Sequence, residues 1–285
     1  MDKLMAKILI IGYGDIGSAL ANVLLDDGHQ VSAIKRTKQK ESASVEIIQL
    51  DVSQTTEVDA CKFDADQIVY ILSPSGRDIS AYQTVFEQGV DQVLSACKKQ
   101  CPHVAITFVS STRVYGQQQG EWLDETSPTE PTDQRGKILL AAENKFLAFN
   151  DKTTLVRFSG IYGRSNYFLN QLKAGEAVQK EPPYYTNRIH RDDCIAVLRF
   201  IINRKIKDET MRGIYLATDQ DPAARWQVAC YLAEIYSIER PKPLVLDKTA
   251  KGNKRLKNKR LTEAGYEFIY KSYKQGYKKT INEQG

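Results

Sequence analysis

Three glycines near the start of the chain have the spacing of a phosphate-binding turn. Gly12, Gly14 and Gly17 form the pattern G-x-G-x-x-G directly after the apolar run at residues 8–11. In such a turn the first glycine permits a tight bend, the second lets the backbone approach a diphosphate, and the third lets the next helix pack on the strand. The residues expected to hold a dinucleotide are therefore Gly12, Tyr13, Gly14, Asp15, Ile16 and Gly17.

Two cations follow the expected second strand, residues 30–34. Lys35 and Arg36 stand where an NAD-binding protein usually places Asp or Glu, about 20 residues beyond the glycines. A carboxylate would repel the 2′-phosphate of NADP, whereas a guanidinium can hold it with two hydrogen bonds. The alternative is a solvated turn that binds nothing. The sequence therefore predicts NADP as the cofactor, in preference to NAD.

These residues must be positioned by regular secondary structure. Along the chain, short apolar runs alternate with longer stretches of helical periodicity. The expected strands are 8–11, 30–34, 45–50, 67–72, 104–109, 153–158 and 214–217, and the expected helices are 16–25, 79–100, 135–149 and 195–202. This alternation indicates an α/β fold, a Rossmann-type doubly wound parallel sheet with a smaller C-terminal substrate-binding lobe. The expected Rossmann domain is residues 1–158, completed by about 188–218, and the expected lobe is 159–187 with 219–285.

Five further segments resemble the motifs of one enzyme family. Residues 108–116 (F-V-S-S-T-R-V-Y-G) place a serine ahead of V-Y-G, and residues 125–128 (E-T-S-P) are similar to an E-x-x-P loop. Residues 155–163 (L-V-R-F-S-G-I-Y-G), 187–193 (N-R-I-H-R-D-D) and 252–278 follow in the family's order. On these motifs almost the whole chain resembles an atypical member of the extended short-chain dehydrogenase/reductase family, the NAD-dependent epimerase/dehydratase family.

The resemblance implies more cofactor contacts and a class of reaction. Asp51 and Val52 match the pair that meets the adenine in the family, and Leu72 and Ser73 match the end of the fourth strand, which flanks the ribose. For Asp51 the alternative is a cap on the next helix. The implied activity is that of an oxidoreductase or epimerase-like enzyme acting on a nucleotide sugar or a related carbonyl or alcohol.

The catalytic positions depart from the family pattern. The family uses a Ser, and a Tyr and a Lys spaced Y-x-x-x-K on one helix, where the phenol exchanges a proton with the substrate. Ser111 matches the serine, but the alignment puts Arg135 at the tyrosine position and Leu139 at the lysine position. Arginine cannot donate a proton near neutral pH, although it can stabilise an oxyanion or a phosphate. Ser111 and Arg135 are the catalytic candidates, and Tyr115 and Tyr162 are alternative acids.

The same departure supports a second hypothesis. A chain that keeps the glycine turn and lacks the Tyr–Lys pair could be a non-catalytic NADP(H)-binding sensor or regulatory protein. The enzyme hypothesis is preferred because Ser111 and the large second lobe are both present. The alternative for Ser111 is a hydroxyl that satisfies the backbone at a strand end, and the alternative for Arg135 is a solvated side chain.

Composition limits the remaining classes of function. The chain has 285 residues, 42% hydrophobic and 26% charged, which is ordinary for a globular protein, and no apolar run reaches the roughly 20 residues of a membrane span. Its five cysteines predict reduced thiols in a cytoplasmic protein, with no metal site. Cys97 and Cys101 could share one helix face, as core or surface thiols or as a metal or redox pair.

Charge is concentrated near the C-terminus. Residues 251–285 hold ten Lys or Arg against three Asp or Glu, although the full chain has a net charge of only +5. A solvated helix face explains this better than a nucleic-acid site, so nucleic acid is not the expected partner. The expected partner is a small-molecule substrate, with no membrane. The resemblance also suggests a homodimer through the helices near 80–100 and 135–149.

Overall fold

The chain forms two compact units. The computed structural model describes residues 5–37, 45–207, 211–247 and 252–282. Unit 1 comprises Met1–Val114, Pro131–Arg157 and Ile195–Tyr215. Unit 2 comprises Tyr115–Glu130, Phe158–Cys194 and Leu216–Gly285. Each unit is built from segments that are distant in the sequence, and each is described by itself.

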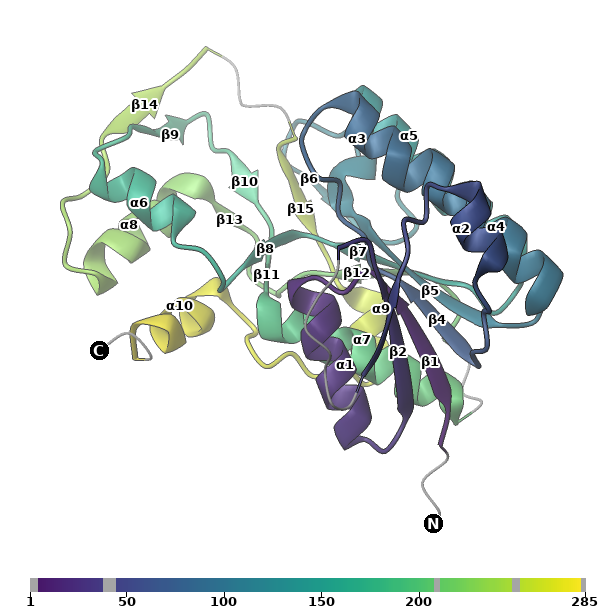
Figure 1. Cartoon of the computed structure of the whole chain (residues 1–285). Helices are drawn as coiled ribbons and strands as arrows, with labels where there is room; N and C mark the ends of the chain where they lie inside the picture. Colours follow the sequence, from purple (N-terminus) through teal and green to yellow (C-terminus); the bar gives the residue numbers. More distant parts are fainter. Residues whose placement is uncertain (1–4, 38–44, 208–210, 248–251, 283–285) are drawn as a thin grey trace. The chain divides into compact units, whose positions relative to one another are not determined.

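A seven-stranded parallel sheet with the order β12-β7-β5-β4-β1-β2-β3 forms the centre of unit 1 (Figure 1). The strands are β1 (Lys7–Ile11), β2 (Gln30–Lys35), β3 (Glu46–Gln49), β4 (Gln67–Tyr70), β5 (Ala105–Ser111), β7 (Thr154–Phe158) and β12 (Gly213–Ala217). The order reverses beside β1, and ligands of such sheets bind at the carboxyl ends of the strands at that reversal. The predicted Rossmann-type sheet is confirmed.

Helices cover both faces of this sheet. They are α1 (Asp15–Asp26), α2 (Thr55–Ala60), α3 (Ile79–Gln83), α4 (Gly89–Gln100), α5 (Gln134–Phe149) and α7 (Arg191–Ile206). Helices α2, α4 and α5 lie on one face, and α1 and α7 on the other (Figure 1). Arg199 of α7 donates to Asp27 at the end of α1 with an Nε–Oδ2 distance of 2.7 Å. This hydrogen bond is the main reason that the pKa of Asp27 is lowered to about 2.

One predicted helix, residues 79–100, is interrupted by a π-helical turn at Thr84–Gln88. Tyr70 of β4 explains the wider turn, because its hydroxyl donates to the carbonyl oxygen of Val85 at 2.5 Å. Gly89 leaves room for the same ring, since a Cβ there would lie 2.8 Å from the Tyr70 hydroxyl. Tyr70 packs in turn on Phe108 and Phe146, which stack with ring centroids 4.4 Å apart. The aromatic core therefore shapes the helix above it.

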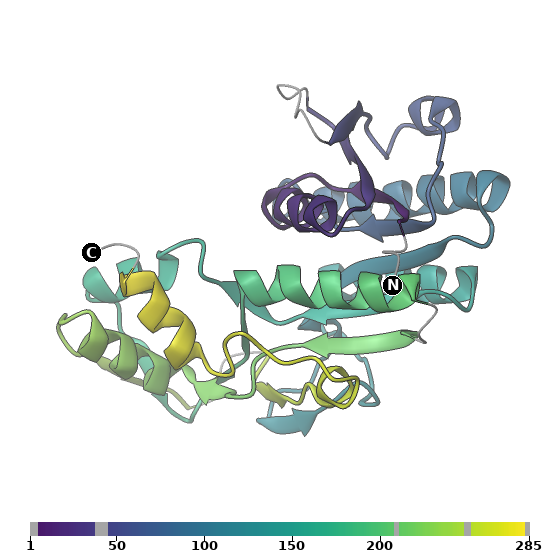
Figure 2. The ribbon, with the colours of Figure 1, turned by 90° about the horizontal axis from the view of Figure 1, so that it is seen from below.

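Unit 2 consists of short strands paired two by two and of short helices. The strand pairs are β6 (Glu121–Leu123) with β15 (Lys254–Leu256), β8 (Gly160–Tyr162) with β11 (Arg188–His190), β9 (Val178–Glu181) with β14 (Pro243–Val245), and β10 (Tyr185–Thr186) with β13 (Ala223–Ala224). The helices are α6 (Tyr167–Lys173), α8 (Arg225–Ile235), α9 (Lys259–Glu263) and α10 (Tyr273–Asn282). Helix α10, in yellow, lies beside α8 (Figures 1 and 2). No helix within the described ranges is long and apolar enough to cross a bilayer.

A half-buried lysine of α7, whose ammonium group lies against the sheet of unit 1, makes stability depend on pH. Lys205 of α7 donates to the carbonyl oxygen of Ile106 at 3.0 Å and to the hydroxyls of Thr107 and Thr154 at 3.4 and 3.2 Å. Burial lowers the pKa of Lys205 from 10.5 to about 7. Between these values the unfolded chain binds a proton that the folded chain does not, so the contribution of Lys205 to the free energy of unfolding rises with pH.

We expect Lys205→Met to remove this dependence. The free energy of unfolding of the variant, measured by urea denaturation from pH 7 to pH 10, should fall relative to that of the native protein as the pH rises. At low pH, folding of the native protein has to desolvate or deprotonate the Lys205 ammonium, and this cost disappears at high pH. The variant has no ionisable group at residue 205, so its stability has no such dependence. A difference between the two proteins that stays constant over this range would contradict a neutral Lys205.

Candidate functional site

The first and third glycines of the turn after β1 have no room for a side chain. Gly12 has φ +118°, and a Cβ on it would lie 2.4 Å from the carbonyl oxygen of Ile71. A Cβ on Gly17 would lie 2.0 Å from the carbonyl oxygen of Gly12. Both distances are far inside van der Waals contact, so glycine is required for the tight bend and for the packing of α1 on β1.

The middle glycine differs from the other two. Gly14 is exposed at the N-cap position of α1, and a Cβ built on it would meet nothing within 4 Å. The structure of this chain alone therefore does not require glycine at residue 14. Open space at a helix N-terminus, where backbone N–H groups lack partners inside the helix, is the arrangement that accepts a diphosphate.

The other predicted cofactor residues lie at the carboxyl ends of neighbouring strands. Lys35 ends β2 and Arg36 follows it with its side chain exposed. Leu72 and Ser73 follow β4, half-buried and exposed, respectively. The ends of β1, β2 and β4 thus carry predicted residues at one edge of the sheet, the edge where such sheets bind dinucleotides.

The Asp51–Val52 pair follows β3 at this same edge. Val52 is buried, with 7% of its surface exposed. Asp51 accepts from the backbone N–H and the hydroxyl of Ser53 at 3.0 and 2.7 Å, while Gln54 holds the N-cap position of α2. The alternative role of Asp51 as the helix cap is therefore not what the structure shows.

Ser111 ends β5 with its side chain half-buried. Its hydroxyl oxygen accepts from the backbone N–H of Arg113 at 3.3 Å. A hydroxyl has a further donor and a second lone pair, so this weak contact leaves it able to bind a ligand. Ser111 thus makes the backbone hydrogen bond that was the alternative to a catalytic role. The same hydroxyl can still contact a ligand.

Arg135 lies in the first turn of α5 and its guanidinium is engaged. Its Nη1 donates to the carbonyl oxygen of Arg77 at 3.1 Å, and its Cζ lies 5.9 Å from the ring centroid of Tyr82. Leu139, one turn further along α5, is buried with 3% of its surface exposed. At the positions that align with the Tyr and Lys of the family, α5 therefore has a cationic side chain and an apolar one. The contact between Arg135 and Tyr82 could not be predicted from the sequence around either residue, because the two residues come from different helices.

A charged pair fixes the start of α5. Asp133 caps the helix by accepting from the backbone N–H of Gly136 at 2.9 Å, and its second oxygen accepts from Arg113 Nη1 at 2.6 Å. Burial alone would raise the pKa of Asp133, but these two partners outweigh it and lower the pKa. A Cβ on Gly136 would lie 2.6 Å from Pro131 Cβ, so the first turn of α5, which carries Arg135, is closely packed.

A buried ion pair fixes the rotation of α5. Glu143 accepts from Arg157 of β7, with an Nη2–Oε2 distance of 2.6 Å and an Nε–Oε1 distance of 3.0 Å. Ser110 of β5 donates its hydroxyl to the same carboxylate at 2.5 Å. The two charged side chains are only 1% and 3% exposed. This network therefore holds α5 against β5 and β7.

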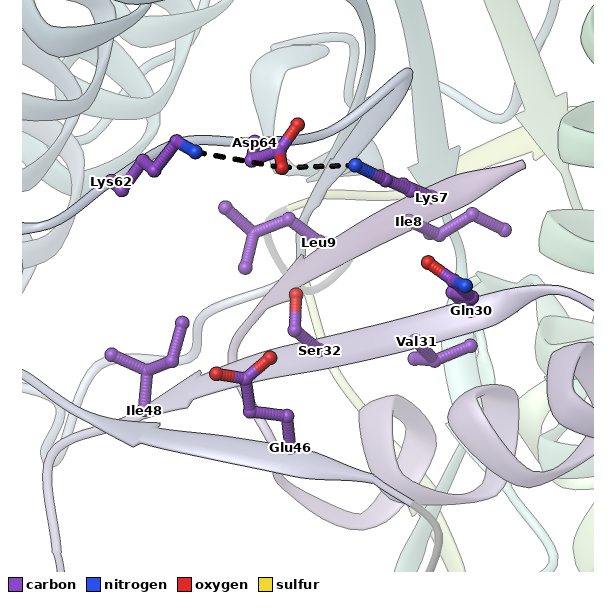
Figure 3. Close-up of a pocket in the computed structure, with 10 residues that line it drawn as sticks. All are labelled: Lys7, Ile8, Leu9, Gln30, Val31, Ser32, Glu46, Ile48, Lys62 and Asp64. Carbon is purple, nitrogen blue, oxygen red and sulfur yellow. Dashed lines mark hydrogen bonds and ion pairs between the residues drawn. The ribbon is translucent and has the colours of Figure 1, made fainter.

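A separate hollow of about 310 Å³ lies over β1, β2 and β3, at residues from the first half of β1 and β2 (Figure 3). Leu9 and Ser32 form part of its lining. Lys7 and Lys62 at its rim both pair with Asp64, at 2.9 and 3.8 Å. Both lysines of this hollow thus already have Asp64 as an ion-pair partner, and the hollow lies away from the strand ends that carry the predicted cofactor residues.

Unit 2 contains a polar cluster of its own around β8 and β11. The hydroxyl of Tyr162 and the Oδ2 of Asp219 are buried and have no hydrogen-bond partner among the described residues. Burial raises the pKa of Asp219 to about 8 and raises that of Tyr162 above its ordinary value. The other candidate acid, Tyr115, is 2% exposed, and its hydroxyl donates to the carbonyl oxygen of Asp124 at 2.9 Å. Both candidate acids are therefore buried in this structure.

Within the ranges that the structure describes, no three His, Cys, Asp or Glu side chains are grouped as metal ligands would be.

The described part of the basic C-terminal segment is folded into unit 2. Leu256 and Leu261 are buried, and Lys254 donates to the carbonyl oxygen of Tyr115 at 2.8 Å. The segment is therefore an ordered part of this unit.

Comparisons with known proteins agree with this geometry. A sequence model of the NAD dependent epimerase/dehydratase family matches residues 8–199. A structure from Methylobacillus flagellatus, described as an NAD-dependent epimerase/dehydratase, is 33% identical, with 98% of each chain covered and a TM-score of 0.83. No curated protein matches this sequence.

Two more distant structures share the fold. The dTDP-glucose 4,6-dehydratase of Bacillus anthracis in complex with NAD is 16% identical, covering 97% of this chain and 95% of that one, with a TM-score of 0.78. MoeE5 in complex with UDP-glucose and NAD is 20% identical, covering 97% of each chain, with a TM-score of 0.76. At these identities the likeness establishes the architecture and no more.

Proposed function

This chain belongs to the NAD-dependent epimerase/dehydratase family, and we propose that it binds NADP(H) and acts as an oxidoreductase or epimerase-like enzyme on a nucleotide sugar or a related carbonyl or alcohol. The observation that carries the proposal is the contrast among the three glycines. Two are required by the fold, whereas Gly14 borders open space at the N-terminus of α1. A diphosphate in that space gives a reason for a glycine that the fold does not need.

The preference for NADP rests on Arg36. Its exposed guanidinium follows the last residue of β2, where the ribose of a dinucleotide bound at the glycine turn would lie. The members of the fold that were solved with NAD give no reason to expect the 2′-phosphate, so this preference comes from the residues of the present chain alone.

Replacing Arg36 by alanine should weaken NADPH binding by about 10- to 100-fold, the worth of a charge-assisted hydrogen-bonded pair. Binding of NADH should change little, because NADH has no 2′-phosphate. Isothermal titration of the native protein and the variant with both cofactors measures this. Lys62→Ala, which removes another exposed cation of unit 1, is the matched control. Tighter binding of NADH than of NADPH by the native protein would refute the preference.

For the chemistry we propose that Ser111 contacts the reacting oxygen of the substrate and that Arg135 stabilises negative charge. In this scheme the nicotinamide supplies or accepts the hydride. Residues 159–187 and 219–285 are proposed to supply the substrate-binding lobe. We also expect the protein to act in the cytoplasm, as a homodimer through α3, α4 and α5.

UDP-glucose, the ligand of one structural neighbour, is the first substrate to test. NMR spectroscopy of UDP-glucose incubated with the protein and NADP⁺ would detect epimerised, oxidised or dehydrated product. Any turnover should fall at least about 100-fold in Ser111→Ala if its hydroxyl takes part in proton transfer. Turnover that is indifferent to Ser111→Ala would refute the assigned role.

A second candidate function has an observation in its favour. Helix α5 carries Arg135 and the buried Leu139 where a proton-transferring pair is expected from the family resemblance. A protein that binds NADP(H) without catalysis would then report the cofactor to a partner. Tight binding of NADPH, with no product from a panel of UDP- and dTDP-sugars, would favour this sensor. A measurable turnover that Ser111→Ala abolishes would exclude it.

A further inference from the structure

The first turn of α5, in unit 1, carries a half-buried guanidinium that forms no ion pair with any described residue. Nη1 of Arg135 donates to the carbonyl oxygen of Arg77 at 3.1 Å, and the Arg135 Cζ lies 5.9 Å from the ring centroid of Tyr82. A backbone carbonyl and an aromatic ring carry no net charge, so the positive charge of Arg135 is not neutralised by them. A guanidinium has five N–H donors, so Arg135 can bind a ligand while it keeps both contacts.

The carboxylates next to Arg135 and Arg77 in the sequence already have other partners. Asp133 accepts from the backbone N–H of Gly136 with one oxygen and from Arg113 Nη1 with the other, at 2.9 and 2.6 Å. Asp78 caps α3 by accepting from the backbone N–H of residue 81 at 2.8 Å. Three arginines at residues 77, 113 and 135 therefore stand against two aspartates, which leaves one positive charge for a ligand.

The same part of unit 1 carries Ser111. This serine ends β5 and is followed at once by a 3-10 turn, Thr112–Val114. That turn packs on the start of α5, because a Cβ on Gly136 would lie 3.1 Å from the carbonyl oxygen of Arg113. Helix α3 packs on α5 as well (Figure 1). The turn after Ser111 and the residue after Arg135 are thus in direct contact, so the two candidate residues belong to one site.

The chemical character of this site is set by a fixed charge. Arg135 keeps its proton up to a pH of about 12, so it offers a permanent cation and no acid. One turn further along α5, Leu139 is buried and apolar. The positive charge of the helix face is therefore placed at residue 135 alone. The planar fork of a guanidinium matches a carboxylate, with which it can form two parallel N–H···O hydrogen bonds.

We propose that the substrate of this site is an acid sugar, a nucleotide sugar with a carboxylate close to the reacting carbon, and that Arg135 binds this carboxylate. The inference rests on the proposed function, because it assumes a dinucleotide at the glycine turn and a substrate at Ser111. It makes Arg135 the residue that selects an anionic sugar over a neutral one.

Two commercially available sugars provide a matched pair of probes. UDP-glucuronic acid differs from UDP-glucose by a carboxylate in place of a hydroxymethyl group. Isothermal titration of the full-length protein, saturated with NADPH, measures the affinity for each. We expect UDP-glucuronic acid to bind at least about ten-fold more tightly, the worth of a charge-assisted hydrogen-bonded contact. The preference should be the same at pH 6 and pH 9, because neither the guanidinium nor the carboxylate titrates in that range.

Arg135→Gln removes the charge and keeps an N–H donor. It should weaken the binding of UDP-glucuronic acid by about 10- to 100-fold and that of UDP-glucose by less than about three-fold. Arg135→Lys keeps the charge without the fork, so it should restore the preference only in part. Lys137→Gln, which removes an exposed cation of the same helix, is the matched control and should leave the preference intact. The NADPH affinity of each variant shows whether it is folded.

Three results would overturn the assignment: affinity for UDP-glucuronic acid equal to or below that for UDP-glucose, a preference that survives in Arg135→Gln, or failure of both sugars to bind. Titration of the native protein with NADPH alone separates this failure from that of the proposed function. Tight NADPH binding without a preference for the acid sugar refutes the role of Arg135 and leaves the cofactor site standing. Absence of NADPH binding refutes both.

Discussion

Gly14→Ala should abolish most of the dinucleotide affinity and lower the free energy of unfolding by no more than about 1 kcal/mol, the difference between glycine and alanine at a helix N-cap. A methyl group at residue 14 meets nothing within 4 Å in the protein itself, and its backbone at φ −89° is open to any residue. The same methyl group would occupy the space that we assign to the diphosphate. Steric overlap of this kind costs about 1–3 kcal/mol, which corresponds to a loss of about 5- to 150-fold in affinity.

Gly17→Ala, three residues on, should behave differently. Its Cβ would lie 2.0 Å from the carbonyl oxygen of Gly12, so β1 and α1 would have to move apart. We expect a loss of at least about 3 kcal/mol in the free energy of unfolding, together with the loss of cofactor binding. Ser18→Ala, in the same turn of α1, is the control for a general effect on the helix.

The contrast between the two glycine variants tests the proposed function directly. Urea denaturation measures the stability of each variant, and titration with NADPH measures its affinity. If Gly14→Ala bound NADPH as tightly as the native protein, no diphosphate could lie against residue 14, and the proposed cofactor site would be wrong. If Gly17→Ala were fully stable, the packing of α1 on β1 would not be as described.

The second large effect concerns the buried ion pair of α5. Arg157→Met should reduce the free energy of unfolding by about 3–5 kcal/mol, because it leaves the Glu143 carboxylate buried without its counter-ion. The double variant Glu143→Met, Arg157→Met should recover most of that loss, since it also removes the uncompensated charge. Ser110 would then lose its acceptor, so recovery should be incomplete.

Urea denaturation of the native protein, both single variants and the double variant completes this cycle. A double variant as unstable as Arg157→Met alone would mean that lost packing, rather than lost charge pairing, causes the effect. Arg212→Met provides the control, because Arg212 pairs with Asp151 at 2.9 Å on the surface, where such a pair contributes about 1 kcal/mol or less.

Much of unit 1 could be predicted from the sequence because its signals are local. The apolar run of β1, the glycines after it and the periodicity of α1 are contiguous, and each depends on the conformational preferences of nearby residues. The predicted strands and helices of the sheet are found within a few residues of their expected bounds. Helix 79–100 was predicted without its π turn, because that turn depends on Tyr70, which lies in another strand.

The sequence by itself determined the parallel α/β architecture and the glycine turn, since both follow from short-range spacing. Only the tertiary structure decided which distant groups meet. It paired the strand at Glu121–Leu123, in a stretch with no periodicity, with a strand at Lys254–Leu256. It also brought Glu143 to Arg157, and Arg135 to Tyr82. The reason is physical: hydrogen bonds and ion pairs between distant segments depend on where the whole chain carries them, and residue spacing along the chain does not contain that information.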